Sequence, residues 1–508
     1  MHPPPELEPR DEHNEHLLAN VHPRDWRNPA PAGRYNLVVI GAGTAGLITA
    51  AVASGLGAKV ALVERALLGG DCLNAGCVPS KAVIRSARRA HEARAAAEIG
   101  LRLDGAADVD FAAVMRRMRQ IRARISEDDS ARRYQTQLGA DVFLGEARFA
   151  GPDTVEVEGA RLRFRKAVIA TGARPVEPPI EGLAAAGFLT NETVFQLTER
   201  PRRLAVIGGG PIGCELAQAF RRLGSEVVLF HNAGHVLNRE DADAAAIVQN
   251  ALLREGVELV LGCRIHKVAA GGGGKSLRFA CEGGGEREVV VDEILVGAGR
   301  APNVAGLGLE SVGVAFDAKR GVHVDDQLRT TNRRIFALGD VAMDWKFTHA
   351  ADAAAKIVVQ NALFFRRLRL SDLVMPWCTY TDPEVAHVGI QEHEARARGI
   401  ELDTFTIPLE RVNRAVCDGE EEGFVKLHVK KGSDRILGAT LVAAHAGEMI
   451  PSITLAMLAG LGLSKIAQAI HPYPTQAEGI KAAANAYLRT RLTPRVARLF
   501  ARFLAWTR

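Results

Sequence analysis

The sequence predicts an α/β protein with about three domains, and three observations support this fold class. The chain has 508 residues, which is too long for a single hydrophobic core. Its composition combines 50 glycines with only 5% aromatic residues, as expected where tight turns join buried strands to helices. The pattern of apolar strand, glycine-rich turn and small-residue helix occurs twice, beginning near Tyr35 and near Arg203.

Residues 1–34 precede the first strand and are predicted to form a flexible arm, because Pro, His, Asp, Glu and Arg are mixed there without a hydrophobic period. No signal peptide is expected, since the segment has no apolar core between a basic region and a small-residue cleavage site. Four histidines of the arm have irregular spacing, which favours disorder over metal binding: His2, His13, His16 and His22.

The first glycine motif, in the run YNLVVIGAGTAGL, consists of Gly41, Gly43 and Gly46 between a buried strand and a helix. Without side chains, such a turn lets a pyrophosphate approach the N–H groups at the helix N-terminus. The next strand ends at Glu64, 18 residues after Gly46, where a carboxylate can accept hydrogen bonds from a ribose. The motif therefore predicts a dinucleotide site.

The run GGDCLNAGCVPSK places Cys72 and Cys77 at the start of a predicted helix, with Pro79 in its first turn. Unpaired N–H groups and the positive end of the helix dipole favour a thiolate there, so the pKa of Cys77 should be lowered. A thiol pair in this setting is a candidate redox centre that opens and closes as a disulfide.

The other five cysteines are scattered without the spacing of a metal site, and no resident metal is predicted. Because the total of seven cysteines is odd, a secreted disulfide framework is not expected, and a reducing, cytoplasmic compartment is the default. These residues are Cys214, Cys263, Cys281, Cys378 and Cys417.

Two long helices are predicted after the cysteine motif, at roughly 81–99 and 111–138, followed by short strands up to the run ATGARP. A glycine-rich hairpin is predicted around 271–274. A later buried strand ends at Gly339 and Asp340 and is followed by a helix over 349–365. From about Met375 the pattern changes to strands with helices between them, which is typical of a separate α+β domain.

The second glycine motif, in the run LAVIGGGPIGCELA, consists of Gly208, Gly210 and Gly213 and predicts a second nucleotide domain. The chain carries His231 18 residues after Gly213, where an acidic residue would favour NADH. Arg239, eight residues further on, is a candidate partner for the 2′-phosphate of NADPH. The choice between NADPH and NADH stays open, with a slight preference for NADPH.

Two dinucleotide sites flanking one thiol pair suggest an electron path from a nicotinamide through a flavin to a disulfide. In this combination of motifs, from about Tyr35 to Tyr487, the chain resembles the flavoprotein disulfide reductases, the family of dihydrolipoyl dehydrogenase, glutathione reductase and mercuric reductase. The resemblance implies an oxidoreductase with two Rossmann-like domains and a C-terminal α+β dimerisation domain. The implied FAD domain covers residues 35–185 and 320–372, the NAD(P)H domain 186–319, and the dimerisation domain of a homodimer 373–490.

The resemblance also implies roles for individual residues. Cys72 would be the thiol that meets the acceptor and Cys77 the thiolate against the flavin. Lys81 and Glu215 would form an ion pair near the flavin ring. Six further positions match residues that bind the flavin or close the nicotinamide domain against it: Thr171, Gly172, Gly299, Arg300, Gly339 and Asp340.

The C-terminal motif HPYPTQAE departs from the thiol-reducing members, which carry a histidine immediately before Pro-Thr. Here Tyr473 occupies that position, while the glutamate four residues after the proline is present as Glu478. Thiol exchange needs a base whose pKa lies near neutrality, and an ordinary tyrosine does not meet this need. His471 is a candidate replacement. A tyrosine at this position resembles the mercuric reductase branch, whose acceptor is a soft metal ion suited to thiolates.

The predicted electron acceptor is therefore a soft metal ion or another small molecule. The chain ends FARFLAWTR, without the second C-terminal cysteine pair of mercuric reductase, so the identity of the metal stays open. Two alternatives remain. One is a dihydrolipoyl dehydrogenase, and the other is a redox sensor or an electron-donating subunit for a membrane partner.

The positive charge of the chain comes from its C-terminal end. The formal charge is +5, and the last 20 residues contain six arginines and no acidic residue. The remainder is close to neutral, so no nucleic-acid interface is predicted. Residues 491–508 are predicted to form a basic amphipathic helix that docks on the dimer or makes a peripheral membrane contact. No transmembrane helix is expected, because the most apolar run, 450–463, is short and contains Pro451.

Overall fold

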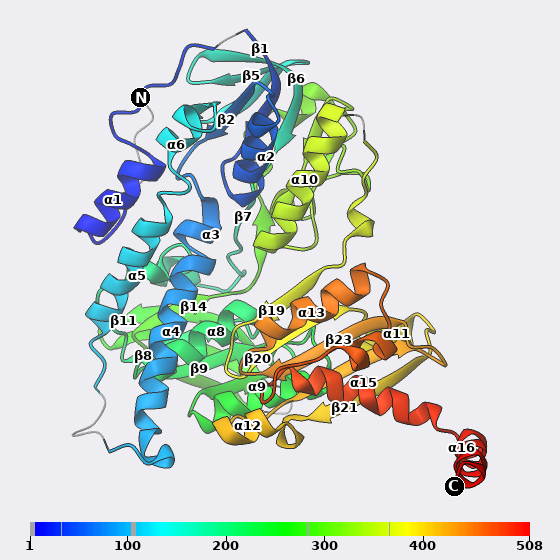
Figure 1. The fold of residues 1–508 in the computed structure, drawn as a ribbon. Coiled ribbons are helices and arrows are strands. Elements are labelled where there is room, and N and C mark those ends of the chain that lie inside the picture. Colours follow the sequence, from blue (N-terminus) through cyan, green and yellow to red (C-terminus); the bar gives the residue numbers. More distant parts are fainter. Residues whose placement is uncertain (1–5, 32, 103–107, 282–283, 365) are drawn as a thin grey trace.

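The apolar run at Tyr35 forms β1, an inner strand of a seven-stranded sheet in the upper part of Figure 1. The computed structural model describes residues 6–31, 33–102, 108–281, 284–364 and 366–508; His2 of the predicted arm and Phe365 of a predicted helix lie outside this set. The parallel strands run in the order β3-β2-β1-β6-β18, and β5 and β4 continue from β6 as an antiparallel meander. The strands are β1 Arg34–Ile40, β2 Val60–Glu64, β3 Ala140–Leu144, β4 Ala147–Gly151, β5 Thr154–Val157, β6 Ala160–Ile169 and β18 Ile335–Ala337.

Two alanine-rich helices, α2 Thr44–Gly55 and α10 Thr348–Phe364, pack against each other beside this sheet (Figure 1). Small buried side chains such as Ala50 and Ala354 let the two backbones approach closely. Between β2 and β3 the described part of the chain forms four further α-helices: α3 Gly70–Asn74, α4 Cys77–Arg94, α5 Phe111–Ile125 and α6 Ala131–Thr136.

The two long helices predicted after the cysteine motif differ from those observed. The first begins four residues earlier, at Cys77, and ends at Arg94 before a short 3₁₀ turn. The second is interrupted between Ile125 and Ala131 by the run SEDDS, whose Ser and Asp side chains compete for backbone hydrogen bonds.

The second glycine motif belongs to a four-stranded parallel sheet with the order β10-β9-β8-β14. A three-stranded antiparallel sheet, β11-β12-β13, is inserted in sequence between β10 and β14, and its first hairpin turns at Gly271–Gly274 as predicted. The elements are β8 Arg203–Ile207, α8 Pro211–Arg222, β9 Glu226–His231, α9 Ala242–Arg254, β10 Glu258–Leu261, β11 Cys263–Gly271, β12 Gly274–Cys281, β13 Glu286–Val291 and β14 Glu293–Val296.

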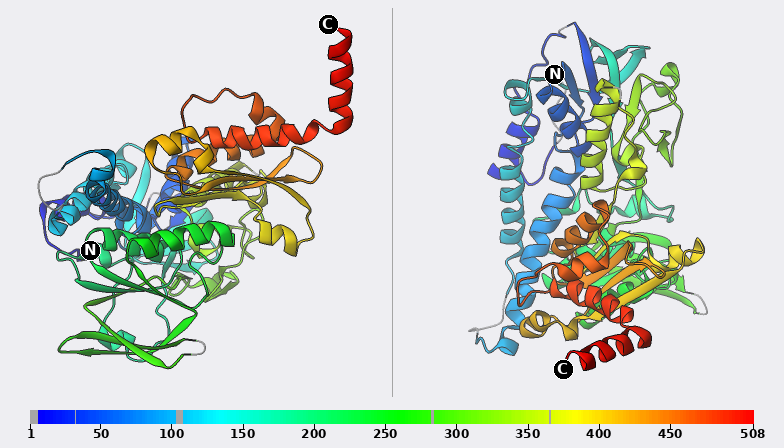
Figure 2. Two further views of the ribbon diagram at one scale, coloured as in Figure 1. Left: turned by 90° about the horizontal axis from the view of Figure 1, so that it is seen from below. Right: turned by 45° about the vertical axis from the view of Figure 1, so that its right-hand side comes forward.

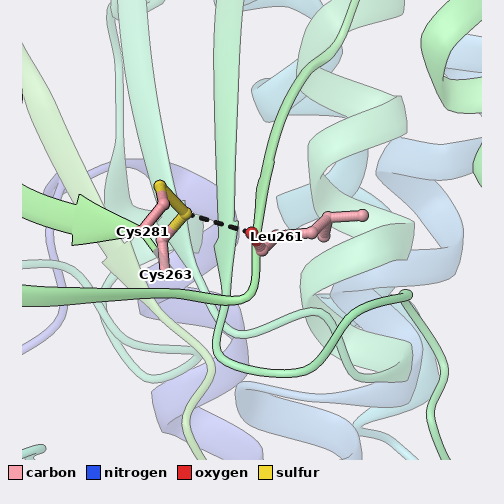
Figure 3. Close-up of a disulfide and its surroundings, with 3 residues drawn as sticks. All are labelled: Leu261, Cys263 and Cys281. Atoms are coloured by element: carbon pink, nitrogen blue, oxygen red, sulfur yellow. Dashed lines mark hydrogen bonds between the residues drawn. A yellow bond between two sulfur atoms is a disulfide. The ribbon is translucent and has the colours of Figure 1, made fainter. Parts of the chain in front are cut away.

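A disulfide joins Cys263 and Cys281 at the outer ends of β11 and β12 (Figure 3). The scattered spacing of these cysteines had not predicted this bond. They are 18 residues apart in sequence, but the hairpin register places them directly opposite each other, with their Cα atoms 4.1 Å apart. The cysteine spacing did not reveal this pair because strand register, not sequence distance, brings the two sulfurs together.

The part of the chain after Met375 forms the expected α+β domain around a five-stranded antiparallel sheet with the order β19-β20-β23-β22-β21. The strands are β19 Pro376–Thr379, β20 Glu384–Gly389, β21 Leu402–Pro408, β22 Phe424–Lys430 and β23 Ile436–Ala443. The helices are α11 Glu392–Ala397, α12 Asn413–Asp418, α13 Ala446–Leu458, α14 Leu463–Gln468, α15 Glu478–Arg491 and α16 Pro494–Trp506.

The apolar run at 450–463 contributes to α13, which packs on this sheet through buried residues such as Ile450 and Ile453. Within the described residues, no helix combines the length and the apolar character needed to cross a bilayer.

The N-terminal segment differs from the predicted flexible arm. Residues Glu12–Val21 form helix α1, which packs against α5 and buries Leu17 and Val21 completely (Figure 1). Asp11 pairs with Arg119 of α5 at 2.6 Å. Mixed composition therefore did not mean disorder here, because the polar side chains of the segment find partners on α5.

Candidate active site

The first glycine turn is a cradle that side chains would fill. Gly41 has φ +99°, and a Cβ there would lie 2.4 Å from the carbonyl oxygen of Ala170. A Cβ on Gly46 would lie 1.8 Å from the carbonyl oxygen of Gly41. Gly43 is the residue immediately before α2, so the free N–H groups of this helix are accessible from the turn. The arrangement fits the pyrophosphate of FAD.

Glu64 stands at the end of β2 beside this turn. Its carboxylate accepts hydrogen bonds from the backbone N–H groups of Ala42, at 2.7 Å, and of Ala66, at 2.8 Å. Burial raises the pKa of Glu64, and these two hydrogen bonds act against that increase. A carboxylate held in this way next to the turn fits the ribose of FAD.

The cysteine motif packs directly on the first glycine turn. Gly69 donates its N–H to the carbonyl of Ala42 at 2.9 Å, and a Cβ on Gly70 would lie 2.6 Å from the Cα of Gly43. Both glycines of the motif have positive φ values, +87° and +55°. The sequence GG before Cys72 therefore allows the short helix α3 to lie against the dinucleotide turn.

Cys72 lies on α3, and Cys77 is the first residue of α4, as the sequence predicted for a thiol at a helix N-terminus. The thiol of Cys72 donates a hydrogen bond to Cys77, which holds the pKa of Cys77 at about 6, with further support from the Thr348 hydroxyl and the charge of Lys81. The sulfur of Cys77 lies 3.4 Å from Oγ1 of Thr348. The same hydrogen bond, together with burial, raises the pKa of Cys72. The lowered pKa of Cys77 and the raised pKa of Cys72 favour the thiolate form at Cys77.

Lys81 lies one helical turn after Cys77 and pairs with Glu215 of α8. Its Nζ is 2.7 Å from Oε2 of Glu215 and 4.4 Å from the centroid of the Tyr380 ring. The other carboxylate oxygen accepts the backbone N–H of Tyr380 at 2.9 Å. Glu215 is buried, so the ammonium and the amide supply the partners that its charge needs.

Arg300 connects the remaining acidic residues near the site. Its guanidinium lies 2.6 Å from Asp71 and 3.2 Å from Asp340, and it also donates to the carbonyl of Ala173 at 2.9 Å. Burial raises the pKa of Asp340, while the charge of Arg300 acts against this. Arg300 begins β15 Arg300–Pro302, which pairs with β7 Ala173–Pro175 and so joins the segments before and after the second nucleotide unit.

The other residues predicted to bind the flavin or to close the nicotinamide domain against it lie on turns near Arg300. Gly172 and Gly339 have φ values of +67° and +75°, and Thr171 donates its hydroxyl to the carbonyl of Asn303 at 2.7 Å. Gly299, just before β15, has φ +122°, and its carbonyl accepts the N–H of Val176 at 3.0 Å.

The second glycine turn repeats the first in detail. Gly208 has φ +121°, and a Cβ on Gly213 would lie 1.8 Å from the carbonyl oxygen of Gly208. Gly210 immediately precedes α8. His231 ends β9, the position that Glu64 occupies on β2, and its Nδ1 accepts the N–H of Gly209 at 3.2 Å. Nε2 of His231 is buried without a hydrogen-bond partner in the part of the chain that is described.

The C-terminal motif lies apart from the cysteine pair within one protomer. Tyr473 is 70% exposed, and its hydroxyl accepts a hydrogen bond from Asn413 at 3.1 Å. Nδ1 of His471 lies 3.3 Å from the carbonyl of Ala469, and Glu478 begins α15. Among the described residues, no hydrogen bond or ion pair links this motif to Cys72 or Cys77.

Sequence reasoning missed several residues that shape the site. Thr348 bonds Cys77 from the start of α10, Tyr380 lies over Lys81, and Asp71 pairs with Arg300. Asp71 adjoins Cys72, so a charge beside the motif was a visible signal for it. Thr348 and Tyr380 are far away in sequence and carry no motif of their own. The described residues contain no cluster of three or more potential metal ligands of the His, Cys, Asp and Glu types.

Comparison with known proteins identifies the family. The pyridine nucleotide-disulphide oxidoreductase family model matches residues 35–355, and the dimerisation domain of the same family matches residues 375–484. The dimerisation domain supports a homodimer.

Two curated relatives cover most of this chain. Mercuric reductase of Lysinibacillus sphaericus is 35% identical over 453 residues, which cover 89% of this chain and 82% of the relative. Dihydrolipoyl dehydrogenase of Thermus scotoductus is 34% identical over 462 residues, covering 89% and 97%. Among solved structures, the Cu(II) complex of the HOCl-induced flavoprotein disulfide reductase RclA from Escherichia coli matches with a TM-score of 0.78 and 28% identity, covering 88% of this chain and 98% of that chain. The chain therefore belongs to the class I flavoprotein disulfide oxidoreductases, in a mercuric reductase-like branch, and is an enzyme of that family that uses FAD and NAD(P)H.

Proposed function

We propose that this enzyme passes electrons from NADPH, through FAD and the Cys72–Cys77 pair, to a soft metal ion. The observation that carries the proposal is the exposed Tyr473 in the place where thiol-reducing members have a histidine base. A phenol is a poorer match than an imidazole for accepting a thiol proton at neutral pH, whereas a metal ion bound by sulfur ligands does not need the proton shuttle of disulfide exchange.

The chain's own residues give the thiol pair a direction. FAD and NADPH supply the hydride chemistry when bound. Two-electron reduction of the Cys72–Cys77 disulfide with one proton yields a Cys77 thiolate and a Cys72 thiol. These protonation states match the lowered pKa of Cys77 and the raised pKa of Cys72. Lys81 stabilises the thiolate electrostatically, and Glu215 fixes the ammonium. Cys72 is then the sulfur available to the acceptor.

The acceptor chemistry follows from two soft sulfur ligands. Reoxidation of the Cys77 thiolate and the Cys72 thiol to the disulfide releases two electrons and one proton, and the two electrons are enough to reduce one mercuric ion to the element or two cupric ions to cuprous ions. The relative from Lysinibacillus sphaericus is named for mercuric ion, and the related Escherichia coli protein is described as a Cu(II) complex. Both names support a soft or borderline metal as the acceptor.

A homodimer completes the site in this proposal. Among the described residues of one protomer, no hydrogen bond or ion pair links Tyr473 or Glu478 to the thiols. We propose that the C-terminal motif acts on the cysteine pair of the other subunit, as the family resemblance implies. The Tyr473 hydroxyl and the Cys72 thiol of the other subunit then bind the incoming ion together.

We further propose that NADPH is the preferred nucleotide, because β9 ends in His231, where a carboxylate would favour NADH. Nδ1 of His231 accepts the Gly209 N–H, so the proton of the neutral ring lies on Nε2, which has no partner among the described residues. The neighbouring carboxylates have partners elsewhere: Glu240 accepts from Trp377, and Asp241 pairs with Lys426. A cytoplasm rich in NADPH is the compartment we expect.

Steady-state turnover with NADPH tests the acceptor. Purified enzyme is given mercuric ion, cupric ion, lipoamide or glutathione disulfide, and we expect turnover with a metal ion that is lost in Cys72→Ser. Tyr473→His is the matched variant, because restoring the family base should raise disulfide turnover relative to metal turnover. Fast reduction of lipoamide by the unmodified enzyme would reject the proposal in favour of a dihydrolipoyl dehydrogenase that uses His471. Absence of turnover with every acceptor would favour a redox sensor.

The thiolate assignment has its own test. Alkylation of the reduced enzyme by iodoacetamide should rise with pH around a midpoint of about 6, since only the thiolate reacts. Lys81→Met removes a positive charge that lowers the pKa of Cys77, so its midpoint should move to higher pH. Cys72→Ala should also raise the midpoint, because it removes the hydrogen-bond donor to Cys77. A midpoint near 8.5 in the unmodified enzyme would reject the assignment.

A further inference from the structure

The C-terminal helix α16 stands away from the body of the protein (Figures 1 and 2). It is separate from α15, because α15 ends at Arg491 and Thr493 caps the start of α16 by accepting the N–H of Val496. Pro494 occupies the first turn, which favours initiation there. None of its residues is buried, although the helix carries five large apolar side chains. Their exposed fractions are 64% for Leu499, 54% for Phe500, 56% for Phe503, 58% for Leu504 and 82% for Trp506.

The apolar side chains of α16 share one side of the helix. At 100° per residue, Val496, Leu499, Phe500 and Phe503 fall in one sector with Leu504 and Trp506. Arg495, Arg498 and Arg502 fall together along one border of that sector. The helix is therefore amphipathic, with a wide apolar face flanked by cations.

The whole C-terminal segment is cationic. From Gly479 to Arg508 the chain contains seven Lys or Arg residues and no Asp or Glu: Lys481, Arg489, Arg491, Arg495, Arg498, Arg502 and Arg508. Within the described part of the chain, no ion pair involves an arginine of α16. The surface that covers this face must supply both apolar contact and negative charge.

Three of the four acidic residues in the run 418–422 have partners within their own protomer, which argues against a second copy of the chain as the occupant. Asp418 pairs with Arg414 at 2.7 Å, Glu420 accepts from Gln476 at 2.6 Å, and Glu422 pairs with Arg254.

We infer that α16 binds the surface of an anionic lipid bilayer and makes the enzyme a peripheral membrane protein. Phe, Leu and Trp side chains would enter the boundary between headgroups and acyl chains, while the three flanking arginines lie among phosphates. A helix of 13 residues spans roughly 20 Å, which is too short to cross a bilayer, so it lies parallel to the surface. This attachment is independent of the acceptor proposed above.

Co-sedimentation of the FAD-loaded, full-length enzyme with vesicles tests the inference. We expect binding to vesicles of phosphatidylcholine and phosphatidylglycerol in equal parts, little binding to phosphatidylcholine alone, and release by salt. Substituting Arg495, Arg498 and Arg502 together by Gln should weaken binding about 100-fold, whereas the Lys versions should retain it. Deletion of residues 494–508 should abolish binding without changing flavin absorbance.

A matched control separates the helix from exposed apolar residues in general. Ile99, the last residue of the 3₁₀ turn Ala96–Ile99 that follows α4, is 75% exposed, and Ile99→Ser should leave vesicle binding unchanged. Failure of the full-length enzyme to bind anionic vesicles at low salt would overturn the inference. So would binding that survives the deletion, or a deletion that instead converts higher oligomers into dimers, since that result would assign α16 to a second copy.

Discussion

The two ends of this chain lie outside the residues that match the family, and they behave in opposite ways. The N-terminal end, with mixed polar composition, is folded onto the first domain, and Leu17, Val21 and even the polar Asn14 and His22 are buried. The C-terminal helix α16 carries more large apolar side chains and buries none of them. The difference teaches that a surface already present in the fold, not the composition of an added segment, decides whether the segment packs.

The N-terminal segment also holds the redox motif from two sides. Arg122 of α5 donates to Oδ1 of Asn14 and to the carbonyl of Asn74, both at 2.7 Å, which joins α1 to the end of α3. On the other side of the motif, Leu68 donates its N–H to the carbonyl of Val21 at 3.2 Å. The segment thereby contacts both flanks of the residues that carry Cys72. By contrast, the hydrogen bonds of α16 stay within 493–507 in the described part of the chain.

Deleting residues 2–30 should have the largest effect on this comparison. Loss of the buried apolar side chains of α1 alone should cost about 5 kcal/mol of unfolding free energy, before any lost hydrogen bond is counted. We expect a large fall in Tm and weaker retention of FAD, measured by differential scanning fluorimetry and flavin absorbance after gel filtration. An unchanged Tm would mean that the N-terminal segment is an accessory layer.

A single substitution reaches the same contact without removing the segment. Arg122→Gln should lower the unfolding free energy by about 2–4 kcal/mol, because the buried Asn14 and Asn74 oxygens lose a charged donor. Arg124→Gln on the exposed side of α5 is the control and should change stability by less than about 0.5 kcal/mol. Equal effects of the two substitutions in urea denaturation would contradict the bridging role of Arg122.

Asn28 tests the far end of the segment with a smaller effect. Its side chain makes a reciprocal pair with the backbone of Leu144 on the edge strand β3, donating at 2.9 Å and accepting at 2.7 Å. Asn28→Ala should therefore cost about 1–3 kcal/mol, while the exposed neighbour Arg27→Ala should be close to neutral. Amide hydrogen exchange provides a second measurement, because protection of Leu144 should fall in Asn28→Ala only.

The parts of the site that could be predicted from the sequence are those whose chemistry needs neighbouring residues at fixed spacing. The glycine turns are of this kind, since Gly41 and Gly46 must be small for one local reason, the contact of a helix start with its own strand. The position of Cys77 at the start of α4 follows from the same local logic. The pairing of Lys81 with Glu215 came from the family resemblance, because 134 residues separate them.

The parts that could not be predicted depend on tertiary register. The disulfide between Cys263 and Cys281 requires the exact alignment of β11 with β12, and the folded N-terminal segment requires donors on α5 that composition does not reveal. Polarity was a poor guide to burial at His22, whose ring bonds the carbonyl of Ala66 just before the redox motif. Local patterns therefore predict the cofactor turns better than they predict what covers them.

The smallest expected effect is also the sharpest contrast with the N-terminal deletion. Removing residues 494–508 deletes 15 residues, yet none of those in α16 is buried and only Val496 and Ala497 are half-buried, so little apolar surface is transferred to water when they are lost. We expect a Tm within about 1 °C of the unmodified enzyme and unchanged turnover in the absence of lipid. If the Tm instead falls by several degrees, α16 packs on the other subunit of the dimer, and the two ends of the chain would then be alike, each stabilising the fold through a surface supplied by the protein itself.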